Sequence, residues 1–149
     1  HRFSNGAAMG AANNGIVDIL VTREPAYRRR LLACGDSFLR GCLPALSFLF
    51  GEILFLRTPF LHDDILQQFR PDLVLTANVE RYLPSTAPDG MRPNFFLYPA
   101  LAGAGYRPDR RFAEALNAVL AYGRPPYAAF LEGLWAAEPA RSPAAATIG

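Results

Sequence analysis

The chain has 149 residues, of which 51% are hydrophobic, so it is long enough for one domain with a buried core and too apolar for a disordered segment. Its 15 basic residues are all arginine, and 13 acidic residues leave a formal charge of +2, which gives no general case for nucleic-acid binding. No apolar stretch approaches the roughly 20 residues that span a bilayer, so we expect no direct membrane insertion.

Residues 1–30 are predicted to form an N-terminal segment with one strand. Residues 1–14 are rich in Gly, Ala and Asn without a clear period, which is typical of a loop, whereas the short β-branched stretch 16–21 predicts a strand. Residues 22–30 are interpreted as a connection. The start at His1, without an initiator methionine or an apolar leader, favours a fragment or a processed piece.

The only basic cluster in the sequence is Arg28-Arg29-Arg30, directly before the strand predicted to start at Leu31. A solvated lead-in to that strand is its ordinary explanation. A surface for a polyanion is the alternative.

The run from residue 31 to 38 predicts a strand, a corner and a helix. Four apolar residues lead to Gly35-Asp36-Ser37, and an apolar pattern with helical spacing follows. Glycine permits a tight turn, and the free N–H groups at a helix start can stabilise an oxyanion beside Ser37. The alternative is that Asp36 or Ser37 only caps the helix.

The predicted helix after Ser37 has an apolar face made of Phe38, Leu39, Cys42, Leu43, Leu46, Leu49 and Phe50. Pro44 either marks the first turn of that helix or kinks it. Cys34 and Cys42 are both interpreted as small buried hydrophobic residues, because their number and spacing suit neither a disulfide nor a metal site.

Three further elements are predicted in order: a strand at 53–56 after Gly51-Glu52, a helix at 63–69 and a strand at 73–77. Alternating strands and helices imply parallel pairing with right-handed crossovers. The carboxyl ends of such strands form the ligand crevice, where Ser37, Arg57 and residues 78–81 would gather.

The C-terminal part is predicted as a long loop at 84–107, a helix at 109–122 with Asp109 as its cap, and a last helix at 127–136. The Ala-, Pro- and Ser-rich residues 137–149 are predicted to be a disordered tail.

The block Gly35-Asp36-Ser37-Phe38, together with the strand that starts at Pro71-Asp72 and ends in Val79-Glu80-Arg81, resembles the SGNH hydrolase superfamily. It is most similar to the SGNH-like domain of alginate and related polysaccharide O-acetyltransferases, over about residues 31–83. The resemblance implies an α/β fold, a three-layer flavodoxin-like parallel sheet flanked by helices, here as an incomplete domain over 31–136. It also implies a periplasmic or extracytoplasmic location.

The resemblance makes Ser37 the nucleophile and Asp36 a supporting residue. The residues expected at the substrate and the oxyanion are Gly35, Asn78, Glu80, Arg81 and Tyr82. Glu80 stands roughly where hydrolases place an asparagine donor, but an ionised glutamate only accepts, so Arg81 is expected to donate there or to bind a sugar carboxylate. The alternative is a Glu80–Arg81 pair that fixes loops. Tyr82 is expected to stack on a sugar ring.

A serine nucleophile needs a histidine base and an orienting acid, and this chain has two histidines. None follows residue 62, which excludes the Asp-x-x-His block of ordinary SGNH hydrolases. In the alginate acetylation proteins an Asp-x-His pair precedes Gly-Asp-Ser, so a truncated chain would lack it. His1 is the candidate remnant of the base, and His62 is interpreted as a helix start with acidic capping.

The resemblance therefore implies a serine acyl-transfer domain that acetylates a carbohydrate. An acylated donor and a carbohydrate acceptor would be its partners, together with subunits of a polysaccharide modification system. No cofactor, metal or nucleic acid is expected. The alternatives are an SGNH esterase or hydrolase and a catalytically degenerate SGNH-like domain that binds a polysaccharide or a partner.

Overall fold

A computed structural model describes residues 1–10, 14–81, 88–89, 95, 98 and 106–120. The strands are β1 (Arg2–Ser4), β2 (Val17–Val21), β3 (Tyr27–Gly35), β4 (Phe50–Leu56) and β5 (Leu73–Ala77). The helices are the 3₁₀ helix η1 (Gly6–Met9), α1 (Ser37–Leu46), α2 (Asp63–Phe69) and α4 (Arg110–Val119). Within the described part of the chain, no helix is long and apolar enough to cross a membrane.

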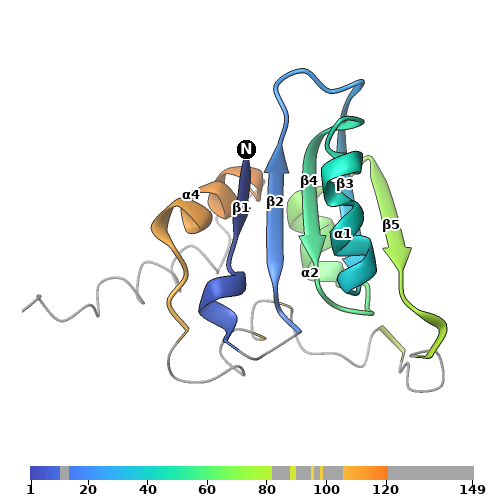
Figure 1. Cartoon of the computed structure of the whole chain (residues 1–149), viewed down its shortest axis with the longest axis vertical. Helices are drawn as coiled ribbons and strands as arrows, with labels where there is room; N and C mark the ends of the chain where they lie inside the picture. Colours follow the sequence, from blue (N-terminus) through green and yellow to red (C-terminus); the bar gives the residue numbers. More distant parts are fainter. Residues whose placement is uncertain (11–13, 82–87, 90–94, 96–97, 99–105, 121–149) are drawn as a thin grey trace, which may run out of the picture.

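The strands form one mixed sheet in the order β1-β2-β4-β3-β5 (Figure 1). β4 and β5 pair with β3 in parallel, as predicted, but β2 runs antiparallel to β4, and β1 runs antiparallel to β2. The parallel pairing predicted for the strands within 31–77 is thus confirmed, whereas β1 and β2 make the whole sheet mixed and not purely parallel as the resemblance implied. Antiparallel strands at the edge of an otherwise parallel sheet are common in α/β folds.

Helices cover both faces of the sheet, which gives three layers (Figure 1). Successive side chains of a strand point to opposite faces. Leu31 and Ala33 therefore pack with α1, whereas Leu32 and Cys34 pack with α2 and α4. Residues 31–35 of β3 are buried, with both faces of the strand covered, whereas Tyr27, Arg28 and Arg29 at its start are exposed.

The predicted elements at 63–69 and 73–77 are confirmed as α2 and β5, and the predicted strand at 16–21 is confirmed as β2. α2 ends at Arg70, which adopts a left-handed conformation (φ 48°) directly before Pro71. The predicted helix at 109–122 is α4, and the Asp109 carboxylate caps it by accepting from the Arg111 N–H. The predicted loop at 84–107 is described only in part, and residues 127–149 lie outside the described residues.

The helix after Ser37 is shorter than predicted. α1 continues through Pro44 and ends at Leu46, where the Ser47 N–H donates to the Leu43 carbonyl and the Ser47 hydroxyl donates to the Pro44 carbonyl. Phe50, Gly51 and Glu52, expected around the end of the helix, begin β4 instead, because they pair with the first residues of β3. β3 itself starts at Tyr27, inside the predicted connection.

Two structured elements replace the loop predicted for residues 1–14, namely β1 and η1. The Asn5 side chain, 1% exposed, holds them in place. Its amide donates to the Gly15 carbonyl and the Tyr106 hydroxyl, and its carbonyl accepts from the Val17 N–H at 2.7 Å. These partners are far away in sequence, so residues 1–14 carry no local sign of this order.

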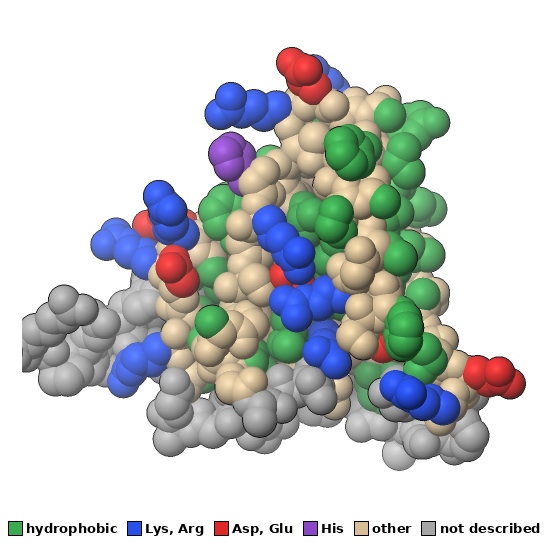
Figure 2. All heavy atoms as spheres, viewed as in Figure 1, with side chains coloured by type: hydrophobic (Ala, Val, Ile, Leu, Met, Phe, Trp, Pro, Cys, Tyr) green, Lys and Arg blue, Asp and Glu red, His purple; other side chains and the backbone are tan. Residues whose placement is uncertain are grey.

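A fully buried carboxylate, Asp18 on β2, joins β1 to α1. It accepts from the Arg2 guanidinium at 3.0 Å and from Arg40 Nε at 2.5 Å. Burial raises the pKa of Asp18, but the hydrogen bonds from Arg40 and Ser4 and the charge of Arg2 outweigh it, and the net shift is downward. Figure 2 shows charged side chains gathered beside α1 on this face.

β5 is an edge strand with little cover on either face. Leu73 is 51% exposed and Val74 is 38% exposed, although the strand is apolar. Apolar side chains line this side of the molecule in Figure 2.

Candidate functional site

The carboxyl ends of β3 and β5, where the sequence predicts a ligand crevice, lie side by side, with Gly35 level with Ala77. The chain passes from β3 through α1 to β4 on one side, and then through α2, on the opposite face, to β5 on the other side of β3. A ligand crevice forms where neighbouring strands lead away in opposite directions. Asp36 and Ser37 follow β3 there, and residues 78–81 follow β5.

Gly35 lets β3 and β5 approach closely at this point. A Cβ atom at Gly35 would overlap the Ala77 carbonyl oxygen and lie 2.8 Å from Leu39 Cδ2. The Asp36 N–H donates to the same Ala77 carbonyl at 3.3 Å. Gly35 is thus required for close packing and has no side chain to offer a substrate.

The Asp36 carboxylate holds α1 and the end of β5 together. Its Oδ1 accepts from the N–H groups of Phe38 at 2.9 Å and Leu39 at 3.4 Å, so it is the N-cap of α1. Its Oδ2 accepts from the Val79 N–H at 2.8 Å. The capping interpretation is confirmed, and the contact with Val79 adds a positioning role that the sequence did not indicate.

Electrostatics keep Asp36 ionised. Partial burial raises the pKa of its carboxyl group, but the hydrogen bonds from Val79, Phe38 and Leu39 and the charge of Arg81 lower the pKa more strongly. The effect of Arg81 places its positive charge within electrostatic reach of the start of α1.

Ser37 is the first residue of α1, and it is exposed. In the described part of the chain, no hydrogen bond is recorded for its hydroxyl or its N–H. Fewer N–H groups are free for an oxyanion than predicted, because those of Phe38 and Leu39 already donate to the Asp36 carboxylate. The Ser37 N–H is the donor that remains beside the hydroxyl.

Phe38, the next residue, is 67% exposed instead of buried as predicted. α1 turns Leu39 and Leu43 to the sheet, which leaves Phe38 and Cys42 on the outer side. Phe38 was not predicted as an exposed neighbour of Ser37, because Phe38 and Cys42 were assigned to the same helix face as Leu39 and Leu43. The three leucines at 39, 43 and 46 have helical spacing, and this pattern could have identified the buried face.

The residues after β5 lie at the same crevice. Asn78, Glu80 and Arg81 are all exposed, and Arg81 makes further interactions of its own. Tyr82 lies outside the described residues. The structure therefore brings Gly35, Asp36 and Ser37 together with the 78–81 segment, and Arg57 follows β4 at the same edge of the sheet.

His1 is at the opposite edge of the sheet, so its proposed role as the base for Ser37 was wrong for this arrangement. Its terminal amine donates to the Val21 carbonyl, and Val21 pairs with Glu52, which is level with Arg30. From Arg30 to Gly35, β3 rises about 17 Å, at roughly 3.3 Å a residue. A contact between His1 and Ser37 is thus excluded by the sheet between them.

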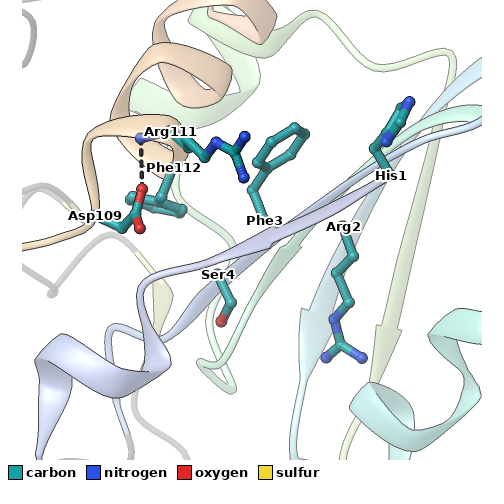
Figure 3. Close-up of a pocket in the computed structure, with 7 residues that line it drawn as sticks. All are labelled: His1, Arg2, Phe3, Ser4, Asp109, Arg111 and Phe112. Carbon is teal, nitrogen blue, oxygen red and sulfur yellow. Dashed lines mark hydrogen bonds between the residues drawn. The ribbon is translucent and has the colours of Figure 1, made fainter.

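The cavity around His1 lies between β1 and the start of α4 and has a volume of about 300 Å³ (Figure 3). It is lined by His1, Arg2, Phe3, Ser4, Asp109, Arg111 and Phe112. In Figure 3 the Arg2 side chain points away from Asp109 and Arg111. Apart from His1, none of the residues predicted around Ser37 lines this cavity.

His62 is buried at the start of α2, as its interpretation as a helix start implied, although its side chain makes no capping hydrogen bond. Its Nε2 lies 3.3 Å from the Thr58 hydroxyl, and its ring packs edge-on against Phe95 and Tyr98. Burial raises the pKa of the nearby Asp64, while the charge of His62 and backbone hydrogen bonds lower it, and the net shift is upward. His62 thus belongs to a buried cluster, and no contact with Ser37 is recorded among the described residues.

The two cysteines differ. Cys34 is fully buried, as predicted, and burial together with the charge of Asp89 raises the pKa of its thiol to about 12, so it is no nucleophile at neutral pH. Cys42 is exposed, so its prediction as a buried residue was wrong, because it lies on the outer side of α1.

Among the described residues, no group of three or more His, Cys, Asp or Glu side chains is arranged to hold a metal ion. No protein-family model, curated protein or solved structure matches this chain. The candidate site therefore rests on its own geometry.

Proposed function

We propose that this chain carries the nucleophile side of a serine acyl-transfer site of the SGNH type, which moves an acetyl group to a carbohydrate hydroxyl. The observation that supports this most is the exposed Ser37 at the first position of α1, beside a carboxylate that clasps the end of β5. The parallel strands, in the order β4-β3-β5, match the first three strands of the 2-1-3-4-5 order of flavodoxin-like folds.

In the proposed reaction, Ser37 Oγ attacks the carbonyl carbon of an acetyl donor while a base takes the hydroxyl proton. The tetrahedral intermediate collapses to acetyl-Ser37, and the donor alcohol leaves with a proton. A sugar hydroxyl then attacks the acetyl group, and Ser37 Oγ recovers a proton. With water as the acceptor, the same steps give an esterase.

The groups around Ser37 suit this chemistry. The Ser37 N–H lies at the positive end of α1, where negative charge on the carbonyl oxygen is stabilised. Arg81 adds a positive charge close to Asp36 and suits a sugar carboxylate. The exposed Phe38 ring offers an apolar surface next to the nucleophile.

A second function is favoured by one observation. His1 is at the other edge of the sheet and His62 is buried against Phe95 and Tyr98, so neither serves Ser37 as a base. A crevice without a base fits a catalytically degenerate domain that binds a polysaccharide or a partner subunit.

The test is acylation of the 149-residue chain by p-nitrophenyl acetate, with and without imidazole as a soluble base. We expect imidazole to accelerate nitrophenol release and one acetyl group to appear on Ser37, located by peptide mass spectrometry. Ser37→Ala should abolish the acetyl group at that position and reduce nitrophenol release to the rate that imidazole gives without protein. Ser47→Ala, at the other end of α1, is the matched control and should acylate at the rate of the unmodified chain.

Equal nitrophenol release from the chain and from Ser37→Ala would overturn the acyl-transfer proposal and leave the binding function. If acetyl-Ser37 forms, adding a sugar acceptor distinguishes transfer from hydrolysis, because an O-acetylated sugar appears only with transfer.

A further inference from the structure

A second concave site lies at the amino edge of the parallel strands, opposite the Ser37 crevice. Its volume is about 360 Å³, at the small end of the range for ligand pockets. It is lined by Val21, Thr22, Arg23, Pro25, Arg28, Arg29, Arg30, Gly51 and Glu52. The connection between β2 and β3 projects beyond the sheet at this edge and forms one wall (Figure 1).

The lining is strongly basic, with four arginines against one glutamate. Two of the four are anchored by neighbours. Arg29 pairs with Asp72 at 3.0 Å, and Arg30 pairs with Glu52 at 2.8 Å, lies over the Phe69 ring and donates to the Val119 carbonyl. These contacts fix the start of β3 and with it the shape of the pocket.

Arg23 and Arg28 are different. Both are exposed, and no ion pair is recorded for either within the described part of the chain. They line the same pocket from two elements, Arg23 from the β2–β3 connection and Arg28 from β3. Two arginines without a recorded ion pair therefore line one concavity, and its only lining carboxylate among the described residues, Glu52, pairs with Arg30.

We propose that this pocket binds a single oxyanion group, a carboxylate, sulfate or phosphate, carried by a small ligand or by one sugar unit. A guanidinium presents a planar fork of N–H donors that matches such groups in a bidentate manner. Gly51 also lines the pocket, and a Cβ atom there would contact Pro25 at 3.5 Å and the Arg28 Cα at 3.7 Å, so its missing side chain leaves room beside these residues.

A single anionic group suits this edge better than a long nucleic acid. Glu52 lines the pocket, and Asp72 neutralises Arg29 beside it. A nucleic-acid surface needs a continuous basic stripe along the phosphate backbone. The acidic residues interrupt such a stripe but leave the two arginines free to act on one group.

The site is independent of the proposed acyl transfer, because it lies about 17 Å from the Ser37 crevice along the strands. Its failure would leave the proposed function untouched.

The test is an NMR titration of the 149-residue chain at low salt, which follows the arginine side-chain and backbone N–H signals. The probes are sodium phosphate, sodium sulfate and sodium glucuronate, with glucose as the neutral counterpart. We expect saturable shifts at residues 22–30 and 51–52 with at least one anion and none with glucose. The double variant Arg23→Gln/Arg28→Gln should weaken that binding about tenfold, as expected for the loss of charge-assisted hydrogen bonds.

Arg110→Gln, an exposed arginine of α4 paired with Glu114, is the matched control and should bind like the unmodified chain. A second variant, Gly51→Val, keeps every arginine and should also weaken binding, because the valine side chain would occupy part of the pocket. Which anion saturates the shifts distinguishes a carboxylate source from a phosphate or sulfate source. Absence of saturation with all three anions, or an equal loss in Arg110→Gln, would overturn the proposal.

Discussion

The two edges of the same three parallel strands handle negative charge in different ways. At the carboxyl edge, the positive end of α1 and its capping carboxylate, Asp36, surround a short hydroxyl side chain. At the amino edge, where helices of a parallel crossover end, the positive charge comes from arginine side chains, and Arg30 donates to the last turn of α4. The carboxyl-edge site thus depends mainly on the position of the α1 backbone and should be sensitive to packing. The amino-edge pocket depends on arginine side chains and should be sensitive to charge.

The largest expected effect is a loss of stability when the packing between β3 and β5 at the carboxyl edge is disturbed. Gly35→Ala places a methyl group against the Ala77 carbonyl oxygen, a backbone atom that cannot move without separating β3 from β5. We expect the free energy of unfolding to fall by about 3 kcal/mol, at the upper end for overpacking, measured by urea denaturation. Gly41→Ala on α1, where nothing lies within 4 Å of the added Cβ, is the control and should stabilise slightly. Similar midpoints for the two variants would contradict the close approach of the strands.

A smaller effect is expected for the carboxylate that joins α1 to β5. Asp36→Asn keeps an oxygen that can cap α1 but replaces the acceptor of the Val79 N–H by a donor, so it should lower the free energy of unfolding at pH 7 by about 1 kcal/mol. Because the folded-state pKa of Asp36 is lowered, its contribution is present above the unfolded pKa of about 3.9 and is lost as the pH falls through the folded value. The difference between the two proteins should therefore shrink below pH 4, as measured by urea midpoints at several pH values. A difference that grows on acidification would show that Asp36 is not held as an ionised cap.

The smallest expected effect is the coupling between the edges. Ser37→Ala should leave the phosphate, sulfate or glucuronate affinity of the amino-edge pocket within twofold of the unmodified chain, because no described contact of Ser37 reaches it. The NMR titration described above measures this. A tenfold change would mean that the two edges respond to each other through β3.

Local sequence was sufficient for the elements whose pattern is self-contained. α2 begins with Asp63 and Asp64 and ends before Pro71, and β5 is a short, mostly apolar run, so both were predicted with correct boundaries. The end of α1 could not be predicted this way, because apolar residues continue from Leu46 into Phe50 across the boundary. Pairing of β4 with β3, a long-range contact, decides where the strand begins.

The candidate site divides in the same manner. The Gly35-Asp36-Ser37 corner predicts an exposed serine and a capping carboxylate from neighbouring residues alone, and both are confirmed. The bond from Val79 to Asp36 spans 43 positions and depends on the register of Gly35 with Ala77, which no local pattern encodes. The antiparallel direction of β2, which places His1 far from Ser37, is equally a property of the assembled sheet.

The two strands that lead to the candidate site differ in burial: residues 31–35 of β3 are buried, whereas β5 is largely exposed. β3 is locked between two cores, so the serine stands on a rigid support, whereas Leu73 and Val74 on β5 face solvent and lose little when the strand shifts. Amide hydrogen exchange should accordingly be slow along β3 and fast along β5. Ser37, the proposed nucleophile, thus follows the more deeply buried of the two strands, and residues 78–81 follow the more exposed one.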